Sequence, residues 1–245
     1  MEFPVEHLSA SSINMFLRCP RQWQQHYVLG LDDGPVGEPL IRGSAVHLAL
    51  SRLLVGKDPG DFFGDVMAEE AREIVITDMD KLRNQVEADI YHYYETVGKY
   101  LDVVSTENEI VLDVGLPIPV VGYVDIVCKD RIIDIKTTNY LSRNVKLNPE
   151  WRTQAHVYQL AHPHPAEFHV LTRSKTDPLI LPGSPSDKLY ISPTDPAKTR
   201  ASIIDTYNQI ALLMESYGED TPWPGNPNHE WANKYCPVPD CCGRF

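Results

Sequence analysis

The sequence has no long hydrophobic segment. No stretch of the 245 residues approaches the ~20 consecutive apolar residues that a membrane-spanning helix needs. The opening residues, MEFPVEHLSASS, are polar and lack the apolar core of a signal peptide. The G-x-x-x-x-G-K-[ST] phosphate-binding loop is also missing, which argues against an ATP-driven motor. We therefore expect a soluble, cytoplasmic protein without a membrane partner.

Basic residues are scarce. The chain has 22 lysines and arginines against 34 aspartates and glutamates, which gives a formal net charge of −12. This balance argues against a broadly basic surface that coats nucleic acid. A local basic channel is still permitted, because phosphate contacts need only a patch.

Cysteines are also few, and their odd number of five does not suggest a disulfide framework in an intracellular protein. Cys128 lies at the end of a predicted strand, where we expect a buried or partly buried thiol. The other four are distributed unevenly, with one near the start and three in the last ten residues: Cys19, Cys236, Cys241 and Cys242.

The apolar residues, 42% of the chain, are sufficient for a sizeable core. Their periodicity indicates helices, a strand meander, a helix, strands, a long helix and an aperiodic tail, in that order. This order predicts an α/β (α+β) fold with a central β-sheet and helical additions. We expect a single domain over 1–245, with N-terminal helices in 1–35, a helical region in 40–104, a core in 105–216 and a cysteine-containing tail in 217–245.

Some element boundaries can be predicted from capping signals. Residues 8–31 predict a short helix, capped by Ser11 or Ser12, that is interrupted at Pro20. Asn148 and Pro149 suit the first positions of the next helix after the strand meander. Further elements are a helix over IRGSAVHLALSRLL, strands over EFHVLTR and KLYIS, and a last helix over 193–216.

Outside its central CKDR turn, the most β-like segment, GYVDIVCKDRIIDIKTT, contains three charges within its strand-forming parts. A hairpin turning at CKDR would place Asp125 beside Asp134, with Lys136 on the same face as Asp134 and with Tyr123 and Val127 on the face of Asp125. Two such carboxylates repel unless a proton or a cation lies between them, and hard oxygen ligands suit Mg²⁺ or Mn²⁺. A lysine there can polarise a water for phosphodiester hydrolysis. A D-x-K triplet alone also occurs by chance on a solvated strand.

The hairpin resembles the D-x8-D-x-K core of the PD-(D/E)xK nucleases, and the chain is most similar to their RecB-like branch. That branch includes the nuclease domain of bacterial helicase–nucleases, CRISPR-associated RecB-like exonucleases and stand-alone phage exonucleases. Four further stretches carry the resemblance, which runs from about residue 8 to 160: LSASSINMFLRCPRQWQQHYVLGL, RGSAVH with Gly43 and His47, GYVDIV, and QAHVY with Gln154 and Tyr158.

The resemblance implies a restriction-endonuclease-like core with a mixed sheet and assigns roles to individual residues. His47, Asp125, Asp134 and the Ile135 carbonyl would hold Mg²⁺ or Mn²⁺, and Lys136 would position the attacking water. A histidine on an apolar helix face is otherwise an ordinary core residue, and an i, i+4 Gln/Tyr pair an ordinary half-buried helix face. Residues expected beside the substrate are Gln154, Tyr158, Arg18, Arg21, Arg143, Lys146 and Arg152.

The resemblance extends to the cysteines. Iron–sulfur members of the branch bind a [4Fe–4S] cluster through one N-terminal and three C-terminal cysteines, which implies that Cys19, Cys236, Cys241 and Cys242 clasp the two ends of the chain together. Here the last three follow the spacing C-x4-C-C, whereas the branch separates them, so a zinc site stays open as an alternative.

We therefore expect a metal-dependent DNA exonuclease that acts on single strands or duplex ends. Two alternatives remain: a catalytically silent nucleic-acid-binding or assembly subunit, and a structure- or site-specific endonuclease. Phage recombination, DNA repair and CRISPR adaptation are compatible pathways. A second copy of the chain, or a recombination or repair protein, is a compatible partner.

Overall fold

A five-stranded mixed β-sheet forms the centre of the computed structural model, which describes residues 3–31, 34–138, 147–172 and 189–226. The strand order is β3-β4-β5-β6-β7, and the pairings are antiparallel except for the parallel pair β5–β6. This confirms the expected α/β (α+β) class. The strands are β3 (Val103–Leu112), β4 (Val120–Cys128), β5 (Ile132–Thr138), β6 (Ala166–Thr172) and β7 (Tyr190–Ile191).

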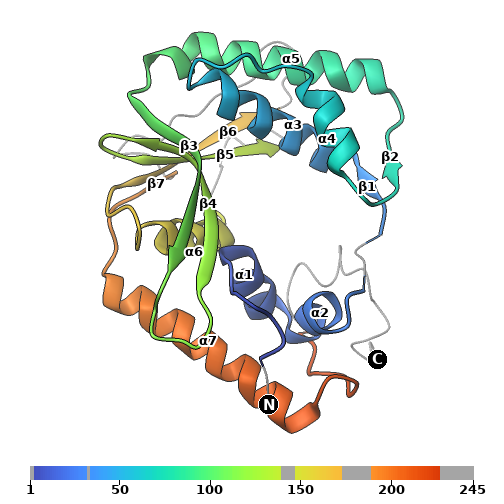
Figure 1. Ribbon diagram of the computed structural model, residues 1–245, viewed down its shortest axis with the longest axis vertical. Helices are drawn as coiled ribbons and strands as arrows, with labels where there is room; N and C mark the ends of the chain where they lie inside the picture. Colours follow the sequence, from blue (N-terminus) through green and yellow to red (C-terminus); the bar gives the residue numbers. More distant parts are fainter. Residues whose placement is uncertain (1–2, 32–33, 139–146, 173–188, 227–245) are drawn as a thin grey trace.

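Helices cover both faces of the sheet, so that the curled sheet separates two groups of helices (Figure 1). One group holds α1, α6 and α7 and the other α3, α4 and α5, and each packs its apolar side chains into a separate core. No described helix is long and apolar enough to cross a membrane. The helices are α1 (Ala10–Arg18), α2 (Pro20–Trp23), α3 (Glu38–Leu53), α4 (Phe62–Glu69), α5 (Met79–Thr96), α6 (Pro149–Tyr158) and α7 (Pro196–Tyr217).

Three short elements complete the description. A π-helical turn (Gln24–Val28) continues α2, and a 3₁₀ turn (Gly98–Tyr100) follows α5. The strands β1 (Val36–Gly37) and β2 (Ile74–Val75) form a separate parallel pair that flanks α3 and α4 in the sequence.

Helix boundaries follow from side-chain caps. Asn148 caps α6 and Pro149 begins it, as predicted. The predicted N-terminal cap of α1, Ser11 or Ser12, was wrong by two to three residues. The cap is Ser9, which forms a capping box with Ser12. Several serines in a row offer alternative caps, and the sequence does not show which one faces the first free backbone N–H groups.

The alternation expected around Asp125 does not hold in β4. Val127 packs into the core on the α1–α6–α7 side, whereas Asp125 contacts His47 of α3, a helix that belongs to the opposite core. Val124 and Ile126 also lie in different cores, although residues two apart in a regular strand share a face. The alternation of faces along β4 is therefore interrupted between Val124 and Val127, and the Asp125 carboxylate lies on the side of α3.

Residues 219–226, which follow α7, pack onto the N-terminal helices. Trp223 is buried and stacks on Trp23, with ring centroids 5.6 Å apart. The Gln24 side chain donates to the carbonyls of Glu219 and Thr221 and accepts from the Trp223 backbone N–H. A single tryptophan in an aperiodic segment leaves no periodic signal.

A buried ion pair joins the helices of one layer to the end of the central strand β5. The Arg42 guanidinium of α3 contacts the Asp89 carboxylate of α5 at 2.8 Å through both Nε and Nη2. Its Nη1 donates to the Thr138 carbonyl at 3.2 Å. Arg42 is 1% exposed, so this charge depends on its partners.

We predict that Arg42→Met lowers the free energy of unfolding by about 3–5 kcal/mol, because it removes the buried guanidinium that contacts the Asp89 carboxylate at 2.8 Å. The double variant Arg42→Met/Asp89→Leu should recover most of this loss. Chemical denaturation of the three proteins measures both effects. Equal losses in the single and double variants would instead assign the stabilisation to the Thr138 contact and to packing.

Candidate active site

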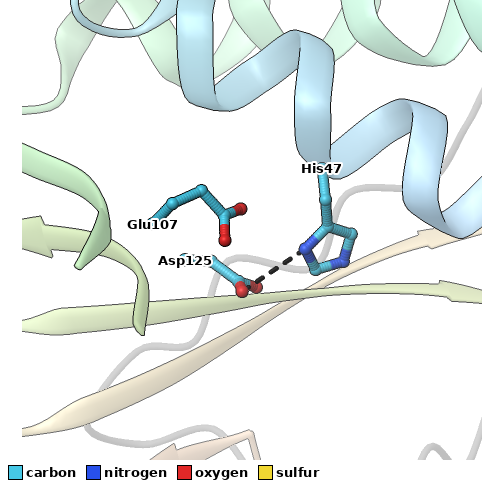
Figure 2. Close-up of side chains that lie close together, drawn as sticks. All are labelled: His47, Glu107 and Asp125. Carbon is cyan, nitrogen blue, oxygen red and sulfur yellow. Dashed lines mark ion pairs between the residues drawn. The ribbon is translucent and has the colours of Figure 1, made fainter. Parts of the chain in front are cut away.

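Three potential metal ligands meet where α3 passes over the sheet (Figure 2). They are the imidazole of His47 from α3 and the carboxylates of Glu107 from β3 and Asp125 from β4. One ligand atom from each lies within 4.8 Å of the others. An imidazole with two carboxylates is a donor set that suits a divalent cation.

Asp125 has a separate role for each carboxylate oxygen. Its Oδ2 accepts a hydrogen bond of 2.6 Å from the Ile135 backbone N–H, and its Oδ1 lies 3.3 Å from Nδ1 of His47. Burial favours the neutral acid, but the charge of His47 and these hydrogen bonds outweigh it, so the pKa of Asp125 is lowered. Asp125 is therefore ionised, and its Oδ1 faces the cluster.

His47 responds to the same contact. Burial disfavours its imidazolium form, but the charge and the hydrogen bond of Asp125 prevail and raise the pKa of His47 to about 9. The cluster thus stabilises a positive charge next to Asp125. A metal ion there would compete with the proton on His47.

Asp134 and Lys136 lie on the neighbouring strand β5. The antiparallel register pairs Ile126 with Ile133, which makes Asp125 and Asp134 cross-strand neighbours. Burial and then the charge of Asp125 raise the pKa of Asp134 to about 6. Its Oδ2 contacts the Lys136 ammonium at 2.7 Å, and among the described residues its buried Oδ1 has no hydrogen-bond partner.

A chain of hydrogen bonds continues from Lys136 into α6. The ammonium donates to Oε1 of Gln154 at 2.9 Å, and Nε2 of Gln154 donates to the Tyr158 hydroxyl at 3.0 Å. Gln154 and Tyr158 are one helical turn apart, so they lie on one face of α6. Asp134 and Gln154 thus hold the Lys136 ammonium from two sides, and Tyr158 fixes the Gln154 amide.

A glycine of the quoted motifs permits the approach of α6. A Cβ on Gly122 would lie 2.9 Å from the Tyr158 ring, closer than real contacts allow. Gly43 lies where α3 contacts β5, but a Cβ there would lie 3.4 Å from Oγ1 of Thr137, which is close to an ordinary contact. Gly122 thus lets Tyr158 of α6 pack onto the sheet.

Glu107 was not predicted from the sequence. It lies opposite Asp125, because its neighbours Thr106 and Asn108 pair with Ile126 and Val124. Its carboxylate is partly removed from water and lies near the charge of Asp125, which raises the pKa of Glu107 to about 7. The only available signal was a glutamate in a polar strand, which usually indicates a solvated face.

A cleft of about 590 Å³ opens beside Lys136 between α1, β4 and α6. Its walls contain side chains that could contact a phosphate or a base. Among them are Arg18, Tyr123, Lys136, Trp151, Gln154 and Tyr158.

Of the predicted substrate-binding arginines that the structure describes, Arg18 lies at the cleft and Arg21 and Arg152 lie outside its lining. Arg18 lines the cleft and pairs with Glu150 at 3.0 Å. Arg21 donates to Gln24 at 2.6 Å and is not among the lining residues, and Arg152 is exposed on α6. Cys19 is buried between α1 and α2. Arg143, Lys146, Cys236, Cys241 and Cys242 lie outside the described residues.

Comparison with known proteins identified one family and several similar structures. The sequence profile of the PD-(D/E)XK nuclease superfamily matches residues 7–243. A candidate exonuclease from Eubacterium rectale has a crystal structure that is 14% identical, with a TM-score of 0.57 over 97% of this chain and 87% of that one. This likeness shows the fold alone. The structure of SSO0001 is 15% identical and covers 86% of this chain and 87% of its own, but its TM-score of 0.42 carries no argument. No curated protein sequence matches.

We predict that NMR titration of the protein in EDTA gives a pKa of about 9 for His47. The His47→Gln variant identifies the signal, and Asp125→Asn should move the pKa toward or below the ordinary 6.5, because burial is then less opposed. Since the folded pKa exceeds the unfolded one, the contact stabilises the fold fully below about pH 6.5 and ceases to do so as the pH rises through about 9. A wild-type value near 6.5 would contradict the contact.

Proposed function

The chain belongs to the PD-(D/E)XK nuclease superfamily, and from this premise we propose that it is a metal-dependent deoxyribonuclease of the RecB-like branch that removes nucleotides from single-stranded or duplex DNA ends. The observation that carries the proposal is the arrangement of Asp125, Asp134 and Lys136. Two buried carboxylates lie side by side, and the ammonium of Lys136 contacts the second at 2.7 Å. This arrangement suits phosphodiester hydrolysis better than stability, because buried like charges destabilise a fold.

The residues fit a divalent metal ion. Asp134 has a buried oxygen without a hydrogen-bond partner among the described residues, and His47 and Asp125 present an imidazole and a carboxylate beside it on neighbouring elements. We assign these three side chains and the Ile135 carbonyl as ligands of Mg²⁺ or Mn²⁺. Such an ion supplies charge stabilisation at the phosphate and a lowered pKa for a bound water.

Lys136 is assigned to the attacking water. Its ammonium is held by Asp134 at 2.7 Å and by Gln154 at 2.9 Å, which leaves it one further proton to donate. That proton can orient a water or stabilise charge that develops on the phosphate. Gln154 cannot turn away easily, because its amide is also bonded to Tyr158.

The cleft beside Lys136 is the proposed site for the DNA strand. Its exposed Tyr123 ring can stack on a base, and Arg18 can pair with a phosphate in place of Glu150. Arg21 and Arg152 remain candidates for contacts farther along the strand.

The rival functions are less well supported. A catalytically silent subunit does not need Asp125, Asp134 and Lys136, which are all present. A site-specific endonuclease needs a base-reading element, and the described residues contain the catalytic sheet, its helices and no separate base-reading unit.

We predict that the protein degrades end-labelled single- or double-stranded DNA with Mg²⁺ or Mn²⁺ and not with EDTA. Asp134→Ala should abolish cleavage without unfolding, because it removes one of two repelling carboxylates. Lys136→Ala should lower the single-turnover rate about 100-fold or more, with DNA affinity nearly unchanged. Lys129→Ala, from the turn of the same hairpin, is the control and should keep full activity.

Two results would change these assignments. An Asp134→Ala protein as active as the wild type means that the metal site is misassigned. A Lys136→Ala protein with weaker DNA binding and an unchanged rate at saturation makes the lysine a phosphate anchor.

We further propose that Cys19 and the three C-terminal cysteines bind a [4Fe–4S] cluster, or else zinc. The support is the position of the last described residues, where Asn226 donates to the Arg18 carbonyl beside Cys19. Only ten positions separate Asn226 from Cys236. Cys19 is buried at the junction of α1 and α2, so a clasp there would join both ends of the chain.

If the cluster forms, anaerobically purified protein is expected to be brown, with absorbance near ~400 nm and about four irons per chain. Cys19→Ala should bleach it and make the chain beyond residue 226 sensitive to protease, while Trp223 stays buried. Cys128→Ala is the matched control, because this buried thiol lies at the end of β4, and it should keep the colour. A colourless protein with one zinc per chain would replace the cluster with a zinc site. A protein that contains neither iron nor zinc would refute the clasp.

A further inference from the structure

Glu107 adopts a backbone conformation that its side chain does not favour. Its φ is +46°, and it is the one non-glycine residue with a positive φ in the part of the chain that the structure describes. For a residue with a Cβ this left-handed conformation costs free energy and persists only where the surroundings impose it. The residue lies inside the ten-residue strand β3, where an extended conformation would be the favourable choice.

The strained residue lies beside the proposed metal ligands. Glu107 is opposite Asp125 in the β3–β4 ladder, and its carboxylate lies within 4.8 Å of the ligand atoms of His47 and Asp125 (Figure 2). Among the described residues no hydrogen bond or ion pair holds this carboxylate. The structure therefore offers no partner within the described chain that would compensate for the strain.

The ligands assigned above offer too little negative charge to balance a divalent cation. The charge of Asp134 is balanced by Lys136, whose ammonium lies 2.7 Å away. A metal-bound His47 is neutral, since the metal takes the place of its proton. Of the ligands assigned above, Asp125 alone would then offer an uncompensated negative charge to a divalent cation. Glu107 is the carboxylate that supplies the second.

We propose that Glu107 is a further metal ligand of this protein, and that the left-handed turn in β3 serves to direct its carboxylate to the ion held by His47 and Asp125. This inference rests on the proposed function, because it assumes that a divalent cation binds there. The ligand class is a hard divalent cation, for which a carboxylate oxygen is a suitable donor.

Isothermal titration calorimetry with Mn²⁺, without DNA, tests the proposal. Glu107→Gln should weaken Mn²⁺ binding about tenfold or more, as loss of groups that support a metal site does. The matched control Glu109→Gln removes the same charge two residues along the same strand, where the carboxylate accepts from the Tyr123 hydroxyl. It should bind Mn²⁺ within about twofold of the wild type, because a solvated charge outside the site is screened.

Thermal unfolding provides a second readout that does not depend on activity. Mn²⁺ should raise the melting temperature of the wild type and of Glu109→Gln more than that of Glu107→Gln. Glu107→Gly should stay folded in EDTA, because glycine accepts a φ of +46°, and it should show the same weakened response to Mn²⁺. It therefore serves as the test variant if Glu107→Gln does not fold.

The outcomes separate the two proposals. Wild-type protein that binds Mn²⁺, with Glu107 variants that bind it equally well, overturns the role of Glu107 and leaves the nuclease proposal intact. Wild-type protein that binds neither Mn²⁺ nor Mg²⁺ overturns the metal-dependent function and the role of Glu107 with it.

Discussion

The structure is organised around two like charges that neighbouring strands bring together. Asp125 and Asp134 are 9% and 6% exposed and are cross-strand neighbours, so their repulsion acts where water screens it poorly. The protein compensates them separately. Asp125 receives the Ile135 N–H and His47, whereas Asp134 receives Lys136. Their pKa values are accordingly shifted in opposite directions, lowered for Asp125 and raised to about 6 for Asp134.

This separation explains why helices from both layers are needed. The α3 layer supplies His47, and the buried Arg42 ties that helix to α5 and to the end of β5. The α6 layer supplies Gln154 and Tyr158, which fix Lys136. A shift of α3 would move His47 away from Asp125, and a shift of α6 would remove the Gln154 contact that fixes Lys136 beside Asp134. Packing far from the chemistry therefore controls the charges at the centre of the sheet.

Periodicity and capping residues were sufficient to predict the order of the elements and the hairpin that joins Asp125 to Asp134, because both depend on local sequence. The face that Asp125 shares with its neighbours was not predictable, since the alternation of β4 is interrupted where Val124 and Ile126 enter different cores. Glu107 was missed for a related reason. A left-handed conformation is signalled by glycine or asparagine, and a glutamate adopts it only when tertiary structure requires it.

The acidic character of the protein bears directly on how it could engage a polyanion. A net charge of −12 repels DNA at long range, and the cleft itself contains Glu150 paired with Arg18. Under the proposed function, a divalent ion between His47, Asp125 and Asp134 reverses the local charge at the point where the phosphate must lie. DNA binding would then depend on the metal as well as on the arginines, because only the loaded site is attractive to phosphate. In this arrangement the carboxylates that repel the substrate in the free protein bind the ion that attracts it, so metal binding prepares the site for the substrate.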